Sequence, residues 1–235
     1  MNNFWENSLP AGYYDKILTK GLKKNKGIQA NWHNATFLAV RSYIHEDDKH
    51  LDFACGPGTF IGNYRLNNSH GVDLAATQIK FANSKYGKQG TFQVSDISNL
   101  KNEKYDVITV IGLLEFINDK EILDTLTTLY ELLNDNGKLV LTTPNYTFSM
   151  LVLEKLLNLI GPISYKNQHI NRFSKTSLKD LLLETSFKSI EIKKIVNITI
   201  FLSFINFNFA KVANSIFTKL FPNVFGFILL AELDK

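Results

Sequence analysis

The sequence has little of several features that would point directly to a function class. Its only cysteine is Cys55, which excludes an intramolecular disulfide and leads us to expect a reducing, cytoplasmic setting. It has no run of about 20 apolar residues, so no membrane-spanning helix is expected. The nearest approach, Ile198–Ala210, is shorter and is interrupted by two asparagines. The N-terminal stretch lacks a basic start followed by apolar residues, and we expect no signal peptide.

An excess of one charge is also missing. Lysine and arginine number 26 against 22 acidic residues, a net charge of +4, and the one compact basic cluster is Lys20–Lys26. A nucleic-acid enzyme usually has a denser basic face, so we expect no nucleic-acid partner and keep RNA only as an alternative.

Clustered metal ligands are scarce as well. The group His45, Asp47, Asp48 and His50 lies in a polar stretch before the first predicted strand, where a solvated loop is the better interpretation. We therefore predict no metal site.

Short apolar runs do alternate with longer helical patterns between residues 50 and 195. This alternation predicts an α/β fold with βαβ units and a parallel sheet. We expect one domain over residues 1–235, with a helical lead or lid (1–48), a ligand-binding core (49–195), and an apolar, Phe-rich segment with a final strand (196–235). The predicted strands are Leu51–Ala54, His70–Asp73, Thr91–Val94, Asp106–Ile111, Lys138–Thr143, Phe187–Ile195 and Gly226–Glu232.

A glycine-rich stretch, Leu51–Thr59, joins the first predicted strand to a helical pattern. Glycines there allow the backbone to approach a ligand at the carboxyl end of the strand. A dinucleotide loop would need a third glycine where Ile61 stands, and no Gly-Lys-Ser/Thr follows to make a P-loop. The stretch fits the pattern apolar-Asp-x-Gly-x-Gly-x-Gly, with Ala54 at the first glycine position.

The order and spacing of several motifs resemble those of the class I S-adenosylmethionine-dependent methyltransferases, especially the branch of ubiquinone-type O-methyltransferases. The resemblance implies a Rossmann-like methyltransferase fold, a seven-stranded, mostly parallel sheet with helices on both faces and an antiparallel last strand. It also implies S-adenosylmethionine as cofactor. The residues that carry it are Leu51–Phe60, Gly71–Leu74, Ser95–Ile97, Tyr105–Ile108, Leu114–Phe116, Lys138–Asn145 and His169–Phe187.

The resemblance also implies a role for individual residues. Asp73 would accept hydrogen bonds from the two ribose hydroxyls, and Asp96 would accept one from the adenine amino group. Ile97 would offer a backbone N–H, and Asp52 would steady the loop through backbone N–H groups. The remaining predicted contacts are Gly56 and Gly58 with the methionine part, Ile111 and Gly112 with the adenosine, and Ala54, Cys55 and Leu74 within the same motifs.

A hydroxyl acceptor would also need a base, most often histidine. The two catalytic candidates are His33, in the lead before the first motif, and His169, in a loop near the strand ends. Phe116 stands where many relatives carry a further histidine.

We expect methyl transfer to a small-molecule acceptor, of aromatic, lipid-like or glycolipid-precursor character. Eight of the 18 phenylalanines fall between Phe201 and Phe227, and this segment could form extra core, a homodimer contact or the wall of an apolar pocket. The alternatives are methylation of RNA or another macromolecule, and a non-catalytic partner subunit. The amino-methylating motif Asp/Asn-Pro-Pro-Tyr is replaced by Gly112–Glu115, which disfavours the nucleic-acid alternative.

Overall fold

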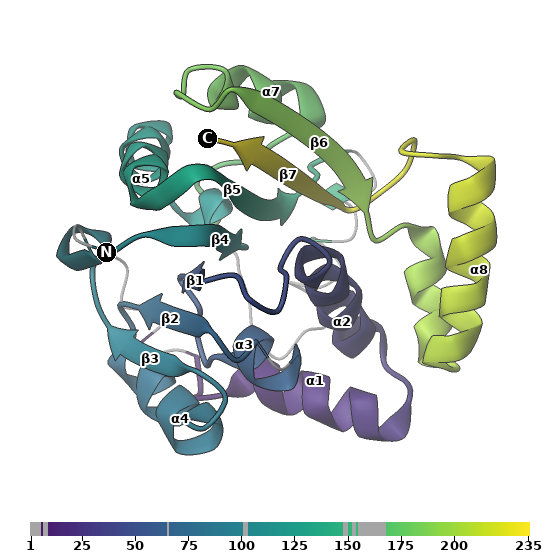
Figure 1. Ribbon diagram of the computed structural model, residues 1–235. Helices are drawn as coiled ribbons and strands as arrows, with labels where there is room; N and C mark the ends of the chain where they lie inside the picture. The colour runs from purple at the N-terminus through teal and green to yellow at the C-terminus, as the bar shows by residue number, and fades with distance from the viewer. Residues whose placement is uncertain are drawn as a thin grey trace.

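A computed structural model describes Glu6 and residues 9–64, 66–100, 103–147, 150–151, 154 and 168–235. Its centre is a seven-stranded sheet with the strand order β3-β2-β1-β4-β5-β7-β6 (Figure 1). The strands are β1 (His50–Phe53), β2 (Ser69–Asp73), β3 (Thr91–Val94), β4 (Tyr105–Ile111), β5 (Leu133–Pro144), β6 (Ser189–Ile195) and β7 (Ile228–Asp234).

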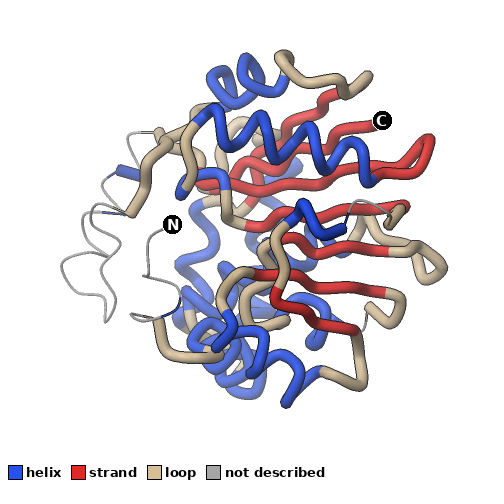
Figure 2. Tube along the Cα trace, turned by 90° about the vertical axis from the view of Figure 1, so that its left-hand side faces the viewer, coloured by secondary structure: helices blue, strands red, loops and turns tan. Residues whose placement is uncertain are grey.

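All strand pairs are parallel except those of β7, which runs antiparallel to both β5 and β6. The strands lie side by side with helices packed around them (Figure 2). The predicted fold class is thereby confirmed, and each predicted strand lies within two residues of an observed one at most of its ends. The exception is β5, which starts at Leu133, because Leu133 already pairs with Tyr105 of β4. The register then shifts, with Asn136 at a positive φ of 66°, and regular pairing resumes at Lys138.

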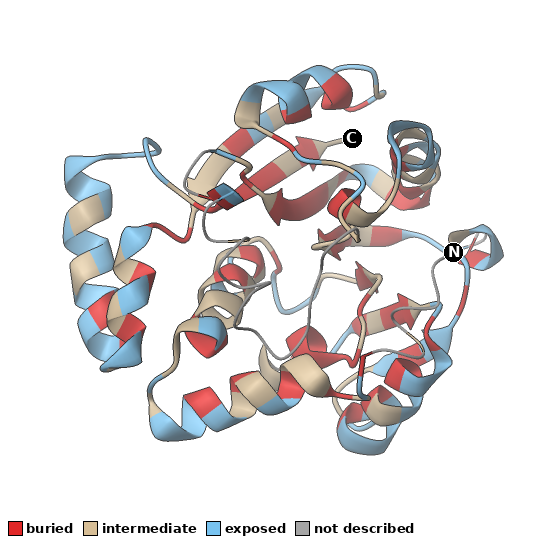
Figure 3. Ribbon diagram, turned by 180° about the vertical axis from the view of Figure 1, so that it is seen from behind, coloured by how far each residue is buried: buried red, intermediate tan, exposed pale blue. Residues whose placement is uncertain are grey.

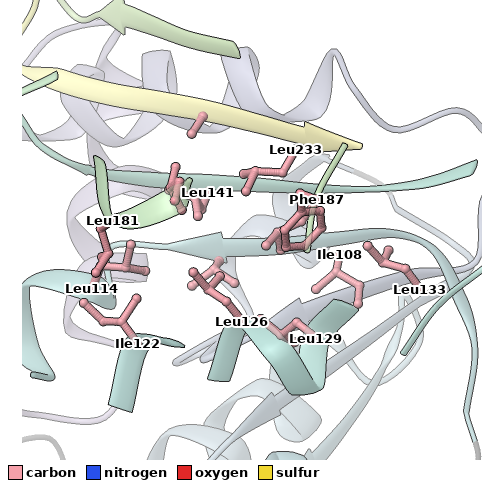
Figure 4. Close-up of a cluster of buried hydrophobic side chains, with 14 of the residues drawn as sticks. Ile108, Leu114, Ile122, Leu126, Leu129, Leu133, Leu141, Leu181, Phe187 and Leu233 are labelled. Carbon is pink, nitrogen blue, oxygen red and sulfur yellow. The ribbon is translucent and has the colours of Figure 1, made fainter. Parts of the chain in front are cut away.

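Alternation along the central strands supplies two cores, because successive side chains point to opposite faces of a sheet. Ile108 and Val110 of β4 join one cluster, whereas Val107 joins the other. The first cluster packs under α5 (Asp119–Leu132) and α7 (Lys175–Leu182), as Figure 4 shows for Leu126, Leu129 and Leu181. The second packs under α2 (Ile28–Arg41), α3 (Thr59–Tyr64) and α4 (Ala76–Tyr86).

The two helices of the first face begin where their capping residues predict. Asn118 and Glu121 form a reciprocal capping box at the start of α5, and Ser174 and Ser177 form one at the start of α7. Each box satisfies backbone N–H groups that a helix start leaves unbonded. The described residues also form the 3₁₀ turns η2 (Ile97–Leu100), η3 (Leu114–Phe116) and η4 (Ile198–Phe204).

Within the predicted helical lead, the chain forms two helices, α1 (Tyr13–Lys24) and α2. The Phe-rich segment folds into η4 and α8 (Phe207–Leu220), which stand beside the sheet next to α1 and α2 (Figure 1). Three hydrogen bonds among the described residues link the pieces. The Gly27 N–H donates to the Ser203 carbonyl oxygen (2.7 Å), the Asn31 amide donates to the Ser203 hydroxyl (2.6 Å), and the N–H of Phe207 at the start of α8 donates to the Asn25 carbonyl oxygen (2.9 Å). None of the described helices is long and apolar enough to cross a membrane.

Candidate active site

The loop between β1 and α3 makes three backbone excursions into positive φ, at Ala54 (60°), Gly56 (53°) and Gly58 (67°). The Cys55 N–H donates to the Val72 carbonyl oxygen of β2 (3.0 Å), and the Gly58 N–H donates to the Cys55 carbonyl oxygen (3.1 Å). These bonds fold the loop tightly over the ends of two neighbouring strands. The left-handed conformation suits glycine, whereas Ala54 adopts it at a cost of about 1–2 kcal/mol.

The two glycines of this loop differ in what surrounds them. A Cβ added at Gly56 would meet nothing within 4 Å, so this position faces open space where a ligand can approach the backbone. A Cβ at Gly58 would lie 2.5 Å from a ring carbon of Phe92 and 2.9 Å from the Ala82 methyl. Gly58 is therefore required by packing between the loop, β3 and α4. The expected contact with the methionine part stays a prediction for both, and its support is stronger for Gly56.

Asp73 ends β2, and one of its carboxylate oxygens bonds the glycine loop while the other bonds the turn that follows the strand. Its Oδ2 accepts the Gly56 N–H and its Oδ1 accepts the Ala75 N–H, each at 2.8 Å. Burial raises the pKa of this carboxyl, although the backbone N–H groups that it accepts act in the opposite direction. A carboxylate has about four lone-pair sites, so two remain to accept hydroxyl groups of a ligand.

The end of β3 supplies the second acid. Asp96 is exposed, and its Oδ1 accepts the Ser98 N–H (3.0 Å), which starts the turn η2. Exposed apolar side chains accompany the two acids, Leu74 (44% exposed) after β2 and Val94 (48% exposed) in β3, with Ile97 half-buried. Acids beside uncovered apolar side chains suit a nucleoside, which has hydroxyl and amino groups around a flat ring.

Beyond β4, the Gly112 backbone has a φ of 68° and its N–H donates to the Thr142 carbonyl oxygen of β5 (3.0 Å). Ile111 and Gly112 are both half-buried at the carboxyl end of the strand. Because β1 and β4 are parallel neighbours, these residues lie at the same edge of the sheet as the glycine loop. The structure thus brings the predicted contact residues of four parallel strands, β1 to β4, to one edge of the sheet.

A buried polar chain that sequence reasoning missed runs along β1, from Asp52 near this edge to His50 at the start of the strand. The His50 ring nitrogens bond the Ser69 hydroxyl (2.8 Å) and the Thr109 hydroxyl (2.9 Å), and Thr109 donates to Asp52 Oδ1 (2.8 Å). The interpretation of His50 as part of a solvated loop is wrong, because it starts β1 and is fully buried. A histidine preceding an apolar run is compatible with either position, and only the partners from β2 and β4 decide it.

Burial raises the pKa of Asp52 to about 7, the Thr109 hydroxyl opposing this. The hydrogen bond found for its side chain goes to Thr109 and not to the backbone N–H groups that we expected. Burial also raises the pKa of Cys55, a free and buried thiol, which makes it an unreactive small residue in the loop.

Glu115 in η3 is a second buried acid. It is 4% exposed, and burial raises its pKa to about 7, while a hydrogen bond from the Thr143 hydroxyl (3.1 Å) favours the ionised form. Its carbonyl oxygen accepts the N–H groups of Ile170 and Asn171, at 2.8 and 3.1 Å. These bonds hold the loop of residues 168–171 against η3, the turn that follows β4.

His169 is thereby placed beside the site. Its ring lies 5.1 Å from the Phe116 ring, and its Nδ1 lies 2.8 Å from the Tyr146 hydroxyl and 3.2 Å from Glu154 Oε1. Burial lowers the pKa of His169, and the Glu154 carboxylate opposes this. With the Nδ1 proton donated to Glu154 or Tyr146, Nε2 carries the ring lone pair, the state that a general base needs.

His33 lies in α2 among aromatic rings, 5.2 Å from Tyr14 and 6.1 Å from Phe37. Phe37 in turn contacts Phe60 of α3 at 5.3 Å, so α2 packs on the helix that follows the glycine loop. Burial lowers the pKa of His33 to about 4, which leaves the ring neutral at pH 7. The described contacts do not join His33 to His169.

Among the described residues, no group of three or more histidine, cysteine, aspartate or glutamate side chains could hold a metal ion. Metal independence stays a prediction.

A Rossmann-like sheet with an antiparallel β7, a glycine loop after β1 and an acid at the end of β2 defines the class of nucleoside-cofactor methyltransferases. A family model described as a methyltransferase domain matches residues 22–192, and the chain belongs to this family. The predicted class I S-adenosylmethionine-dependent methyltransferase is thus confirmed, with S-adenosylmethionine as methyl donor. Comparison with curated proteins finds no match.

Solved structures share the fold. A methyltransferase from Archaeoglobus fulgidus matches at 20% identity and a TM-score of 0.58, covering 85% of this chain and 93% of that one. Magnesium protoporphyrin IX methyltransferase from Synechocystis, solved with bound S-adenosylhomocysteine, matches at 16% identity and a TM-score of 0.63. The match covers 99% of this chain and 97% of that one. A chain from the complex between the Trm112 methyltransferase activator of Haloferax volcanii and a methyltransferase matches at 16% identity and a TM-score of 0.61. The match covers 95% of this chain and 94% of that one.

Proposed function

We propose that the protein transfers a methyl group from S-adenosylmethionine to a small apolar or aromatic acceptor that carries a hydroxyl. The observation that carries the proposal is the setting of His169, a neutral imidazole between the Phe116 and Tyr146 rings and beside the Glu154 carboxylate. Aromatic side chains suit an apolar acceptor, and a carboxylate-oriented imidazole suits removal of a hydroxyl proton.

The cofactor residues act by position. Asp73 would hold the ribose hydroxyls, Asp96 and the Ile97 N–H would hold the adenine, and the open backbone at Gly56 would face the methionine part. S-adenosylmethionine supplies an electrophilic methyl group on sulfur. The protein therefore has to align an acceptor oxygen with that methyl, and alignment alone can contribute about 7–11 kcal/mol.

The lead supports a covered site. The Gly12 N–H donates to the Gln78 side-chain oxygen (3.0 Å), and the Gln78 amide donates to the Leu9 carbonyl oxygen (3.4 Å). Gln78 lies in the first turn of α4, directly after Asp73 and Leu74. The start of the lead thus contacts the first turn of α4, next to the predicted ribose site. Exclusion of water by such a cover would protect the transfer.

Of the two predicted bases, His169 is the better placed, because its loop is bonded to η3, the turn that follows β4. His169→Ala should lower turnover by about two to four orders of magnitude, the usual contribution of a general base, and leave S-adenosylhomocysteine affinity unchanged. His33→Ala serves as the matched variant on the other histidine. A larger loss with His33→Ala would reverse the assignment.

The acceptor class is tested with methyl-labelled S-adenosylmethionine and fractionated cell extract. We expect label in the small-metabolite or lipid fraction. Label in RNA would establish the macromolecular alternative, and absence of label with intact cofactor binding would establish the non-catalytic one. Membership of the ubiquinone-type O-methyltransferase branch and a cytoplasmic location belong to the same proposal, supported by the motif spacing and by the single, buried thiol Cys55.

A further inference from the structure

The outer face of η4, α8 and the following turn is the most apolar exposed surface among the described residues. Of the eighteen large hydrophobic side chains that are exposed, eleven belong to this segment. We call them the outer apolar face: Ile198, Phe201, Phe204, Ile205, Phe209, Val212, Ile216, Leu220, Phe221, Val224 and Phe225. Contiguous exposed apolar surface on this scale marks an interaction site.

The helix spacing shows why this face is turned outward. Phe209, Val212, Ile216 and Leu220 recur at intervals of three and four residues, so they form one stripe along α8. The buried positions Phe207 and Ala210 lie on another side of the same helix. Phe207 belongs to the Phe-rich segment for which the sequence leaves core, subunit contact and pocket wall open. Its side chain is buried, and its N–H donates to the Asn25 carbonyl oxygen (2.9 Å), so this residue docks the helix on the lead.

The helix therefore has two apolar sides. One side docks on η4 and the lead, and the other has no covering among the described residues. Figure 3 shows α8 at the edge of the molecule with much of its length exposed.

The charges around this face all have one sign. No acidic residue occurs between Glu191 and Glu232, whereas the segment contains Lys193, Lys194, Lys211 and Lys219. Lys211 and Lys219 are exposed and take part in none of the ion pairs among the described residues. The neighbouring lead adds exposed lysines on α1 and after it, namely Lys16, Lys20, Lys23, Lys24 and Lys26.

The position of the face relates it to the site. β6 runs parallel to β5, since both are antiparallel to β7, so the connection from β6 to β7 leaves from the carboxyl edge of the sheet. The glycine loop after β1 leaves from the same edge. A surface bound by the outer apolar face would thus lie at the end of the molecule where the methyl group is transferred.

We propose that the outer apolar face binds the surface of an anionic lipid bilayer. The phenylalanines and aliphatic side chains would enter the boundary of the acyl chains, and the lysines would lie among the negatively charged headgroups. A second copy of the chain fits less well, because the same lysines would meet each other across a two-fold contact. The inference goes beyond methyl transfer and does not depend on the identity of the acceptor.

The test is co-sedimentation of the full chain with vesicles of phosphatidylcholine alone and of phosphatidylcholine mixed equally with phosphatidylglycerol. We expect binding to the mixed vesicles to be stronger by about tenfold or more, from about 1 kcal/mol per lysine near the surface. Replacing Ile216 and Leu220 together by glutamate should weaken it by at least about tenfold. Leu183→Glu, at an equally exposed leucine at the end of α7 (62% against 67% for Leu220), should leave it unchanged.

Two further measurements make the outcome decisive. Circular dichroism and S-adenosylhomocysteine affinity should be the same for all variants, because the substituted side chains are exposed. Lys211→Gln with Lys219→Gln should reduce the preference for mixed over neutral vesicles. Equal binding of wild type and the glutamate variant to mixed vesicles would overturn the proposal. So would a lipid-free dimer, seen by analytical ultracentrifugation, that the glutamate substitutions dissociate, since it would make this face a subunit contact.

Discussion

The carboxyl edge of the sheet, where the predicted cofactor residues lie, differs from the outer apolar face in how its side chains are bonded. At the edge, Asp73 bonds two backbone N–H groups, and Asp52 lies in a buried chain with Thr109 and His50. On α8, apolar side chains are exposed, and the charged residues of the helix are the lysines Lys211 and Lys219. Sites that recognise a defined small molecule need fixed polar geometry, whereas a surface needs apolar area and charge of one sign. Substitutions at the carboxyl edge should therefore change cofactor affinity, and substitutions on the outer apolar face should change vesicle binding.

The largest effect is expected at Asp73. Asp73→Ala removes the acceptor for two ribose hydroxyls, each bond to a charged group being worth about 1.5–3 kcal/mol, so S-adenosylhomocysteine affinity should fall by about a hundredfold or more. Asp73→Asn keeps one acceptor oxygen, which can still accept the Gly56 N–H. This variant therefore tests whether the lost bond to the glycine loop alone explains the effect. Calorimetry on Ile216→Glu should give wild-type affinity. Unchanged affinity in Asp73→Ala would remove this residue from the site.

The two loop glycines sharpen the distinction between packing and ligand contact. Gly58→Ala forces a methyl against Phe92 and Ala82 at a positive φ, and should destabilise the fold by about 2–5 kcal/mol from overpacking and backbone strain. Gly56→Ala has space around its Cβ and should cost only about 1–2 kcal/mol of strain. Urea unfolding measures both. Equal destabilisation by the two substitutions would contradict the packing role of Gly58.

The buried acids give a pH dependence. Burial raises the folded-state pKa of Asp52 to about 7, above its unfolded value, so the folded state holds the proton more tightly. This stabilisation is fully present below about pH 4 and is lost as the pH rises towards 7. Asp52→Asn should therefore reduce the loss of unfolding free energy between these pH values. Asp124→Asn, on the exposed side of α5, is the control.

Two histidines with lowered pKa values oppose this trend in the wild type. Burial lowers the pKa of His33 to about 4 and that of His50 to about 3, so their contribution is present above the unfolded pKa and is lost as the pH falls. The difference between wild type and Asp52→Asn isolates the acid. Parallel pH profiles of the two proteins would show that Asp52 does not titrate in this range.

The smallest effect is expected at Ala54. Its φ of 60° suits glycine, so Ala54→Gly relieves strain, while the greater freedom of glycine in the unfolded chain opposes the gain. Thermal unfolding should show a net stabilisation of less than about 1 kcal/mol. A clear destabilisation would mean that the alanine methyl makes packing contacts that outweigh the strain.

The sheet could be predicted from the sequence because its strands are short apolar runs that end in Asp, Gly or Asn. The same patterns located Asp73, Asp96 and the glycine loop. The buried position of His50 could not be predicted, because its partners Ser69 and Thr109 come from other strands. Nor could the sequence predict which side of α8 is buried. Both sides are apolar, and only contact with the lead decides between them.

The most direct test of the cofactor assignment is calorimetric titration of the wild-type protein with S-adenosylhomocysteine and, separately, with NAD⁺. The glycine loop, with Ile61 in place of a third glycine, and the acids after β2 and β3 predict saturable binding of S-adenosylhomocysteine at one site and no heat with NAD⁺. Binding of NAD⁺, or no binding of S-adenosylhomocysteine by folded protein, would contradict it.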